Sequence, residues 1–238
     1  MTDYRLQPLR RWSAQFSLTV NAMSKDNTTA PLPVVVFADF VCPYSYIALD
    51  QIDDLVRDYN IELLWRPHWL YPEVPPAGAP LPAEVAVEER RTRTRAWLNE
   101  MAPQRAAQMR FPDRIHFSLF AFEALEFAQD RGLALPFKTA VFEALWMEGR
   151  DIGQFSTLQA AAEKVGLDSA DLGRALAAHR YRQRVHDALQ LALDAGVSKT
   201  PTFVLGRYRI EGWHYYEVLQ TVMEKQGVPL RSALVPLR

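Results

Sequence analysis

The chain has 238 residues, of which 49% are hydrophobic and 23% are charged. This length fits one or two domains, and the apolar share excludes an intrinsically disordered chain. Lys plus Arg number 27 and Asp plus Glu 28, so the net charge is −1, without the basic surplus that general binding of nucleic acid or anionic lipid needs. No apolar run approaches the roughly 18 residues of a transmembrane helix. We therefore expect a globular protein whose partners include neither nucleic acid nor a membrane.

Cys42 is the single cysteine of the chain. One cysteine cannot form an internal disulfide, and it excludes a structural zinc site with several thiolate ligands. We expect no metal site. Thiol chemistry at this residue must take its second sulfur from another molecule.

Residues 1–32 are predicted to form an N-terminal tail. Arg10 and Arg11 precede residues 12–20, but Ser, Gln and Thr interrupt the apolar core that a signal peptide needs. We therefore expect a flexible or loosely docked extension and a cytoplasmic protein.

The ordered part of the chain begins with a strand, a helix and a second strand. Residues 34–40 form a short apolar run that is typical of a buried strand. Pro43 suits the first turn of the helix that follows, which runs to about Tyr59 with apolar residues at helical spacing. Residues 61–65 form the next strand, so this segment is a βαβ unit with a right-handed crossover.

The pattern changes after this unit. Residues 72–82 contain five prolines and cannot form a helix or a central strand. Helices then follow almost without interruption. We expect them near residues 84–109, 113–131, 135–149, 155–165, 168–178 and 180–195, with Gly132, Gly149, Gly166 and Gly196 at helix ends and Asp168 or Ser169 as a cap.

The β pattern returns after Gly196. Residues 202–205 and 208–211 are predicted to form a hairpin, and residues 214–226 a closing amphipathic helix. We therefore predict an α/β frame made of residues 33–82 and 196–238, with residues 83–195 as a helical insertion domain.

Cys42 lies where the first strand meets the first helix. At the N-cap, unpaired backbone N–H groups and the positive end of the helix dipole favour a thiolate, so we expect the pKa of this thiol to fall below that of a free cysteine. Pro43 stiffens the turn, and Ser45 can direct its hydroxyl back at the sulfur. The alternative is a small buried hydrophobic side chain, which is the usual role of a lone cysteine.

Other residues are candidates for substrate binding. Thr200 and Pro201 precede the strand at 202–205, and a cis bond between them would expose the Thr200 backbone for pairing with a peptide or glutathione beside Cys42. Tyr44 is expected at the cleft rim. His68, just after the second strand, and Trp213, near the start of the last helix, are further candidates for ligand contact.

Four segments together carry a family resemblance. They are FADFVCPYSYIALDQI, LLWRPHWLYPEVP, FEALWMEGRDIGQFSTLQAAAEKVGLD and GVSKTPTFVLGRYRIEGWHYYEVL. In this order they resemble the FrnE-like branch of the DsbA-family oxidoreductases, which is related to 2-hydroxychromene-2-carboxylate isomerases and kappa-class glutathione transferases. The resemblance implies a thioredoxin-like fold interrupted by a large all-helical insertion, with Cys42 as nucleophile and Thr200-Pro201 as the cis-proline loop.

One residue departs from that pattern. Dithiol enzymes of the FrnE-like type have a second cysteine where this chain has Ser45, whereas the isomerase and kappa proteins begin the motif with serine. The resemblance therefore implies a thiol-disulfide oxidoreductase that works through one cysteine, with glutathione or another external thiol releasing the mixed disulfide. The alternatives are a glutathione-dependent transferase or isomerase and a non-catalytic binding protein. We expect no bound cofactor, glutathione as a possible co-substrate, and a monomer or homodimer.

Overall fold

The computed structural model describes residues 7–8 and 31–231. Most of the predicted tail lies outside the described residues. The exceptions are residues 31–32 and the pair Gln7–Pro8. This pair forms strand β1 and pairs antiparallel with residues 208–209. This pair adds an edge strand that we did not expect of a tail.

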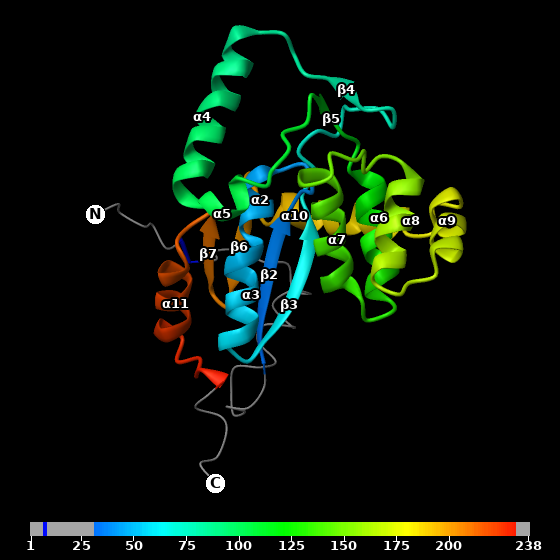
Figure 1. The fold of residues 1–238 in the computed structure, drawn as a ribbon. Coiled ribbons are helices and arrows are strands. Elements are labelled where there is room, and N and C mark those ends of the chain that lie inside the picture. The colour runs from blue at the N-terminus through cyan, green and yellow to red at the C-terminus, as the bar shows by residue number, and fades with distance from the viewer. Residues whose placement is uncertain (1–6, 9–30, 232–238) are drawn as a thin grey trace. The chain divides into compact units, whose positions relative to one another are not determined.

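The strands at the two ends of the chain form one mixed sheet (Figure 1). The order is β1-β7-β6-β2-β3. Its longer members are β2 (Leu32–Ala38), β3 (Ile61–Pro67), β6 (Thr202–Leu205) and β7 (Tyr208–Glu211). Strand β3 runs parallel to β2, as the predicted βαβ unit requires, and β6 runs antiparallel to it. The predicted hairpin of β6 and β7 is confirmed.

Clustering of backbone contacts divides the chain into two compact units. The first unit comprises residues 1–38, 48–68 and 189–238, and the second comprises residues 39–47 and 69–188. The second unit thus overlaps the predicted insertion over residues 83–188, and it also contains the Cys42 turn.

In the first unit, apolar side chains of the sheet form the core. Val35 and Phe37 of β2 and Val204 of β6 pack with Ala192 and Val197. Helix α3 (Leu49–Asp58) lies in front of the strands in Figure 1 and packs against α11 (Tyr216–Lys225). The helix that we predicted as continuous from Pro43 is interrupted at Ala48, so that α2 (Pro43–Ile47) is a separate short helix.

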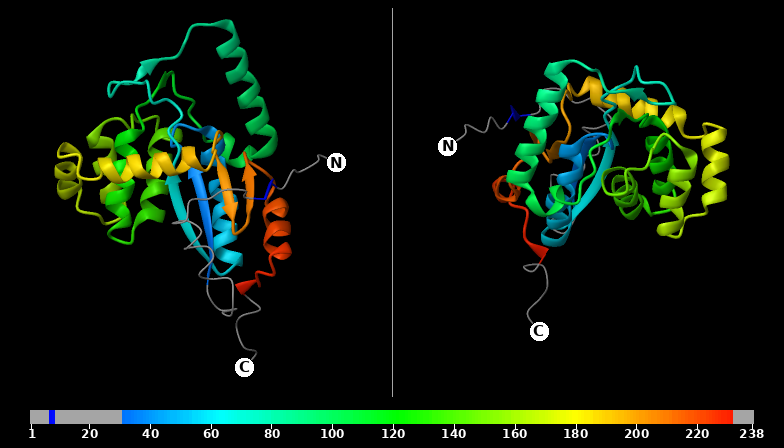
Figure 2. Two further views of the ribbon diagram at one scale, coloured as in Figure 1. Left: turned by 180° about the vertical axis from the view of Figure 1, so that it is seen from behind. Right: turned by 45° about the horizontal axis from the view of Figure 1, so that its top comes forward.

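The second unit is mainly helical, and its green-to-yellow bundle is seen from two sides in Figure 2. Its helices are α4 (Val85–Met101), α5 (Pro103–Ala106), α6 (Leu119–Gln129), α7 (Ala134–Trp146), α8 (Phe155–Lys164), α9 (Ser169–Ala177) and most of α10 (Arg182–Asp194). Helices α6 to α9 contact one another. None of the described helices combines the length and apolarity needed to cross a bilayer.

Two predicted helices have different bounds in the structure. The predicted helix at 84–109 is divided before Pro103, which begins α5 and cannot continue the hydrogen bonding of α4. The predicted helix at 113–131 begins only at Leu119, because β5 (Arg114–Ile115) pairs with β4 (Ala79–Pro80). The four expected glycine ends are confirmed, since each of these glycines has a positive φ near 70°.

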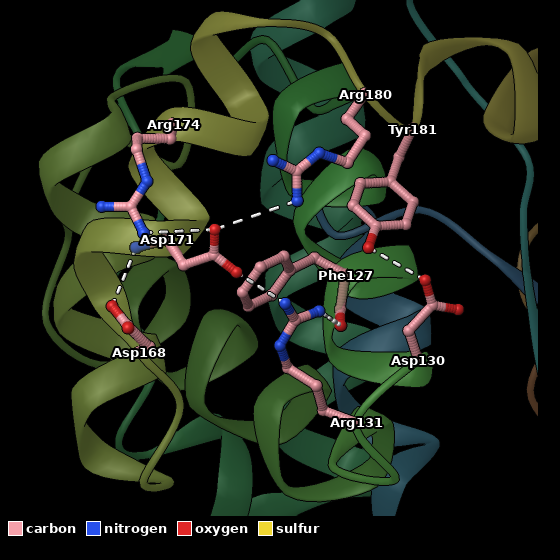
Figure 3. A network of polar contacts seen from close by, with 8 residues as sticks. All are labelled: Phe127, Asp130, Arg131, Asp168, Asp171, Arg174, Arg180 and Tyr181. Carbon is pink, nitrogen blue, oxygen red and sulfur yellow. Dashed lines mark hydrogen bonds and ion pairs between the residues drawn. The ribbon is translucent and has the colours of Figure 1, made fainter.

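Polar contacts connect the helices at one end of the bundle (Figure 3). Asp171 pairs with Arg131 at 2.6 Å and Arg174 at 3.3 Å, and with Arg180 at 3.9 Å. The Asp168 carboxylate accepts the backbone N–H of Asp171 at 2.8 Å, so the predicted cap of α9 is confirmed. This network thus connects the start of α9 with the turn after α6 and with the segment before α10 through charges of both signs.

Candidate functional site

Cys42 lies in the turn that joins β2 to α2. Its backbone N–H donates to the carbonyl of Asp39 at 3.1 Å, and its own carbonyl accepts the N–H of Tyr46 at 3.2 Å. Pro43 is the first residue of α2, where its missing N–H and fixed φ do not disturb the helix. The predicted order of strand, cysteine and helix is therefore confirmed.

The Cys42 side chain is more enclosed than we expected of a nucleophile. The residue is 4% exposed. The Tyr71 hydroxyl interacts electrostatically with Cys42 and also with Asp39, so the surroundings of the thiol are not purely aliphatic.

Asp39 is a fully buried carboxyl group at the start of the same turn. Its oxygens accept the backbone N–H groups of Val41 at 3.3 Å and Leu70 at 2.8 Å. Burial raises the pKa of Asp39 to about 6, although these backbone hydrogen bonds oppose the shift. We did not predict Asp39 as a site residue, although a carboxylate directly after a buried strand is a sequence signal that could have identified it.

Aromatic packing holds the turn in the second unit. The ring of Phe40 lies 4.9 Å from that of Phe142 and 5.7 Å from that of Phe122. The indole N–H of Trp146 donates to the Phe40 carbonyl at 2.9 Å, and Tyr46 stacks on the same indole. These contacts limit the freedom of the backbone on both sides of Cys42.

Helix α4 covers the start of α2. The Tyr44 hydroxyl donates to Thr94 Oγ1 at 3.3 Å, and the Tyr44 ring meets Trp97 edge-on with 5.2 Å between centroids. Tyr44 is half-buried. Thr94 and Trp97 are three residues apart and share one face of α4, and sequence reasoning did not connect either of them with the cysteine.

Tyr71 and Arg90 are two further polar residues of this region. The pKa of Tyr71 is raised chiefly by burial of the phenol; Arg90 lowers it, whereas Cys42, Asp39 and Glu73 raise it. The phenol therefore lies within electrostatic range of both the thiol and a guanidinium. Neither residue was predicted, because Tyr71 follows the second strand and Arg90 lies within a charged helix, a pattern typical of a solvated surface.

Ser45 is fully buried in α2. Its Oγ forms no hydrogen bond with any residue in the described part of the chain. The expected contact of this hydroxyl with the Cys42 sulfur would be such a hydrogen bond, so that contact is not made. Ser45 occupies the position one helical turn after the cysteine without a polar partner.

The other predicted site residues belong to the first unit. The Thr200–Pro201 bond is cis, and the Pro201 carbonyl accepts the Gly212 N–H at 2.7 Å, one residue before Trp213. The His68 N–H donates to the carbonyl of Ala38, the last residue of β2, at 3.0 Å, and burial lowers the pKa of the His68 imidazole. In the first unit, Thr200 and Pro201 thus precede β6, His68 follows β3, and Trp213 follows β7.

Comparisons with known proteins cover nearly the whole described chain. The model of the DsbA-like thioredoxin domain family matches residues 33–224. The 2-hydroxychromene-2-carboxylate isomerase of Sphingobium xenophagum is 29% identical over 133 residues, which are 56% of this chain and 68% of that protein.

Solved structures share the fold. A probable DsbA oxidoreductase from Streptomyces coelicolor superposes with a TM-score of 0.71 at 22% identity, over 87% of this chain and 93% of that one. The cytosolic disulfide reductase DsbM from Pseudomonas aeruginosa, solved with GSH, superposes with a TM-score of 0.59 at 17% identity, over 82% and 98%. The predicted thioredoxin-like fold with its helical insertion is therefore confirmed, and the chain belongs to the family of DsbA-like thioredoxin domains.

Proposed function

We propose that this protein is a thiol-disulfide oxidoreductase that acts through Cys42 alone. The observation that carries the proposal is the position of the only cysteine, in the turn between β2 and α2 and directly before Pro43. Backbone N–H groups at the start of a helix favour a thiolate at this position. Membership of a family of oxidoreductases and isomerases supports an enzymatic role.

The proposed reaction consists of two exchange steps. In the first, the Cys42 thiolate attacks one sulfur of a substrate disulfide; the Cys42–substrate bond forms, the substrate S–S bond breaks, and the second sulfur leaves as a thiolate. In the second, an external thiolate attacks the substrate sulfur of the mixed disulfide and releases Cys42 as a thiolate. Electrons pass from the external thiol to the substrate, and the protein returns to its starting state.

Glutathione is the external thiol that we propose. The chain has no second cysteine to resolve a mixed disulfide, so a small and abundant thiol is the simplest partner. The structural neighbour DsbM is named as a cytosolic disulfide reductase and was solved with GSH, which supports both this choice and a cytoplasmic location. We further propose that Thr200, Pro201, His68 and Trp213 contribute to substrate binding.

Two observations favour a second function. Ser45 replaces the second cysteine, and a relative 29% identical to this chain is named as an isomerase. In that case bound glutathione attacks a small electrophile, and no net electron transfer takes place. The two functions differ in whether turnover requires the Cys42 sulfur.

A turnover assay separates these functions. The substrate is the mixed disulfide of glutathione and 2-mercaptoethanol, with reduced glutathione as the second substrate. Wild-type protein is expected to accelerate its reduction, and Cys42→Ser is expected to be inactive, while Ser45→Ala keeps the activity because its hydroxyl has no polar partner in the described chain. Equal rates for wild type and Cys42→Ser would contradict the monothiol mechanism. Thioether formation with a chloronitrobenzene that survives in Cys42→Ser would favour the second function.

A further inference from the structure

Two polar side chains near Cys42 form no hydrogen bond or ion pair within the described part of the chain. Arg90 is exposed on α4, and the Tyr71 hydroxyl belongs to a half-buried side chain. Neither group forms a hydrogen bond or an ion pair with any residue between 31 and 231 or with residues 7–8. A guanidinium and a phenol are both hydrogen-bond donors, and together they suit an anion better than a neutral or cationic group.

The geometry of α4 directs Arg90 toward the cysteine turn. Arg90 precedes Thr94 by four residues and Trp97 by seven, so the three side chains lie on one face of the helix. Thr94 and Trp97 contact Tyr44, two residues after Cys42. Arg90 therefore continues the face that covers the start of α2, one turn farther toward the N-terminus of α4.

A second connection places Tyr71 at the same turn. The N–H of Leu70, its neighbour in the chain, donates to the Asp39 carboxylate at 2.8 Å. The pKa of Tyr71, which is raised mainly by burial, also responds to Arg90, Cys42 and Asp39. The phenol, guanidinium and thiol thus share one neighbourhood within the second unit.

Positive and negative charges do not balance around Arg90 and Tyr71. Glu88 pairs with Arg91 at 3.6 Å and Glu89 pairs with Arg93 at 3.7 Å, so these two carboxylates are already compensated. Asp39 is buried beneath the turn. The exposed Glu73, two residues after Tyr71, is a further negative charge, and it raises the pKa of Tyr71. The guanidinium of Arg90 forms no ion pair with a described residue, so its charge is not compensated in this way.

From this arrangement we infer that Arg90 and Tyr71 bind a carboxylate of the substrate, so that the disulfides used at Cys42 are small molecules that carry a carboxylate near the sulfur. The inference rests on the proposed thiol-disulfide exchange and names its substrate class. The guanidinium supplies charge and up to two parallel donors, and the phenol supplies a third. The carboxylate is held while the Cys42 sulfur attacks the neighbouring S–S bond.

Three disulfides of similar length and different charge test the inference. They are 3,3′-dithiodipropionate, 2-hydroxyethyl disulfide and cystamine, which are anionic, neutral and cationic. The rate of mixed-disulfide formation at Cys42 is followed by intact-protein mass spectrometry and divided by the rate for the same protein unfolded in urea, which removes the intrinsic reactivity of each probe. Wild-type protein is expected to prefer the anionic probe over the neutral one by about threefold to tenfold and to disfavour the cation.

Matched variants assign the preference to Arg90. Arg90→Ala and Tyr71→Phe are expected to remove most of the preference, and Glu73→Gln to increase it. Arg93→Ala removes the same charge from an exposed position of α4 where the arginine already pairs with Glu89, so it is expected to keep the wild-type preference. High salt should reduce the preference in wild type.

The outcomes distinguish the two proposals. Equal normalised rates for the three probes, or a preference that Arg90→Ala retains, would overturn the inference and leave the exchange reaction intact. A folded protein that reacts with none of the probes would overturn both the proposed function and the inference.

Discussion

The carboxylate of Asp39 accepts the backbone N–H of Leu70 at 2.8 Å and thereby joins the Cys42 turn to the segment that carries Tyr71. The two residues are 31 positions apart in the chain. Asp39 is fully buried, and this single side chain connects two pieces of irregular backbone through its hydrogen bonds with Val41 and Leu70. The arrangement has a measurable consequence for stability.

The stability of the protein is expected to depend on pH through Asp39. Burial raises the pKa of this carboxyl from 3.8 to about 6 in the folded state. Between these two values the folded state holds a proton that the unfolded state has lost, so the free energy of unfolding falls as the pH rises. The contribution of Asp39 to this fall is about 3 kcal/mol, essentially complete above the folded-state pKa.

Asp39→Asn tests this dependence. Asparagine does not titrate, so the difference in unfolding free energy, wild type minus Asp39→Asn, should decrease from about pH 4 to about pH 7. Urea denaturation at several pH values measures it. The exposed Asp53→Asn, measured in parallel, is the matched control for the loss of a carboxylate. A difference for Asp39→Asn that stays constant with pH would contradict the role of burial.

Ser45→Cys is expected to create a dithiol enzyme. Ser45 lies three residues after Cys42, one turn along α2, and its hydroxyl has no partner in the described chain, so a thiol fits in its place at little cost. An internal resolving thiol should raise the rate of insulin reduction by an order of magnitude or more, because the second step becomes intramolecular. Unchanged insulin reduction would show that position 45 does not resolve the mixed disulfide.

Trp146 is expected to stabilise the cysteine turn through its indole N–H. Trp146→Phe leaves the buried Phe40 carbonyl without its donor, which costs about 1–3 kcal/mol of unfolding free energy. Trp69→Phe is the matched control, since Trp69 is half-buried and its indole N–H has no partner among the described residues. Urea denaturation of the two variants measures the costs, and equal costs would argue against a specific role for this hydrogen bond.

Much of the fold was predictable from local patterns. The run of apolar residues in β2, the spacing in α3 and the hairpin at Gly206 each depend on neighbours in the chain, and the structure confirms them. The predicted start of α6 was wrong because Arg114–Ile115 pairs with Ala79–Pro80. That contact joins residues far apart in the sequence, which a periodicity cannot reveal.

The residues of the candidate site likewise differ in how far the sequence predicts them. The position of Cys42 before Pro43 follows from the sequence, because strand ends and helix starts have local signals. Arg90 carries no such signal, since only its electrostatic interaction with Tyr71, on another segment, connects it with this region. Ser45 shows the opposite case: spacing predicted its place on the helix, whereas the direction of its hydroxyl depends on packing that spacing does not determine.

The reactivity of the folded protein toward glutathione disulfide shows whether Cys42 can act as a nucleophile. Native protein is incubated with the disulfide, quenched, and weighed as intact protein, in parallel with a sample unfolded in urea. The folded chain is expected to gain one glutathionyl group, with Cys42→Ser as the unmodified control. A folded chain that stays unmodified while the unfolded chain reacts would contradict it, because the 4% exposed cysteine would then be a buried structural side chain.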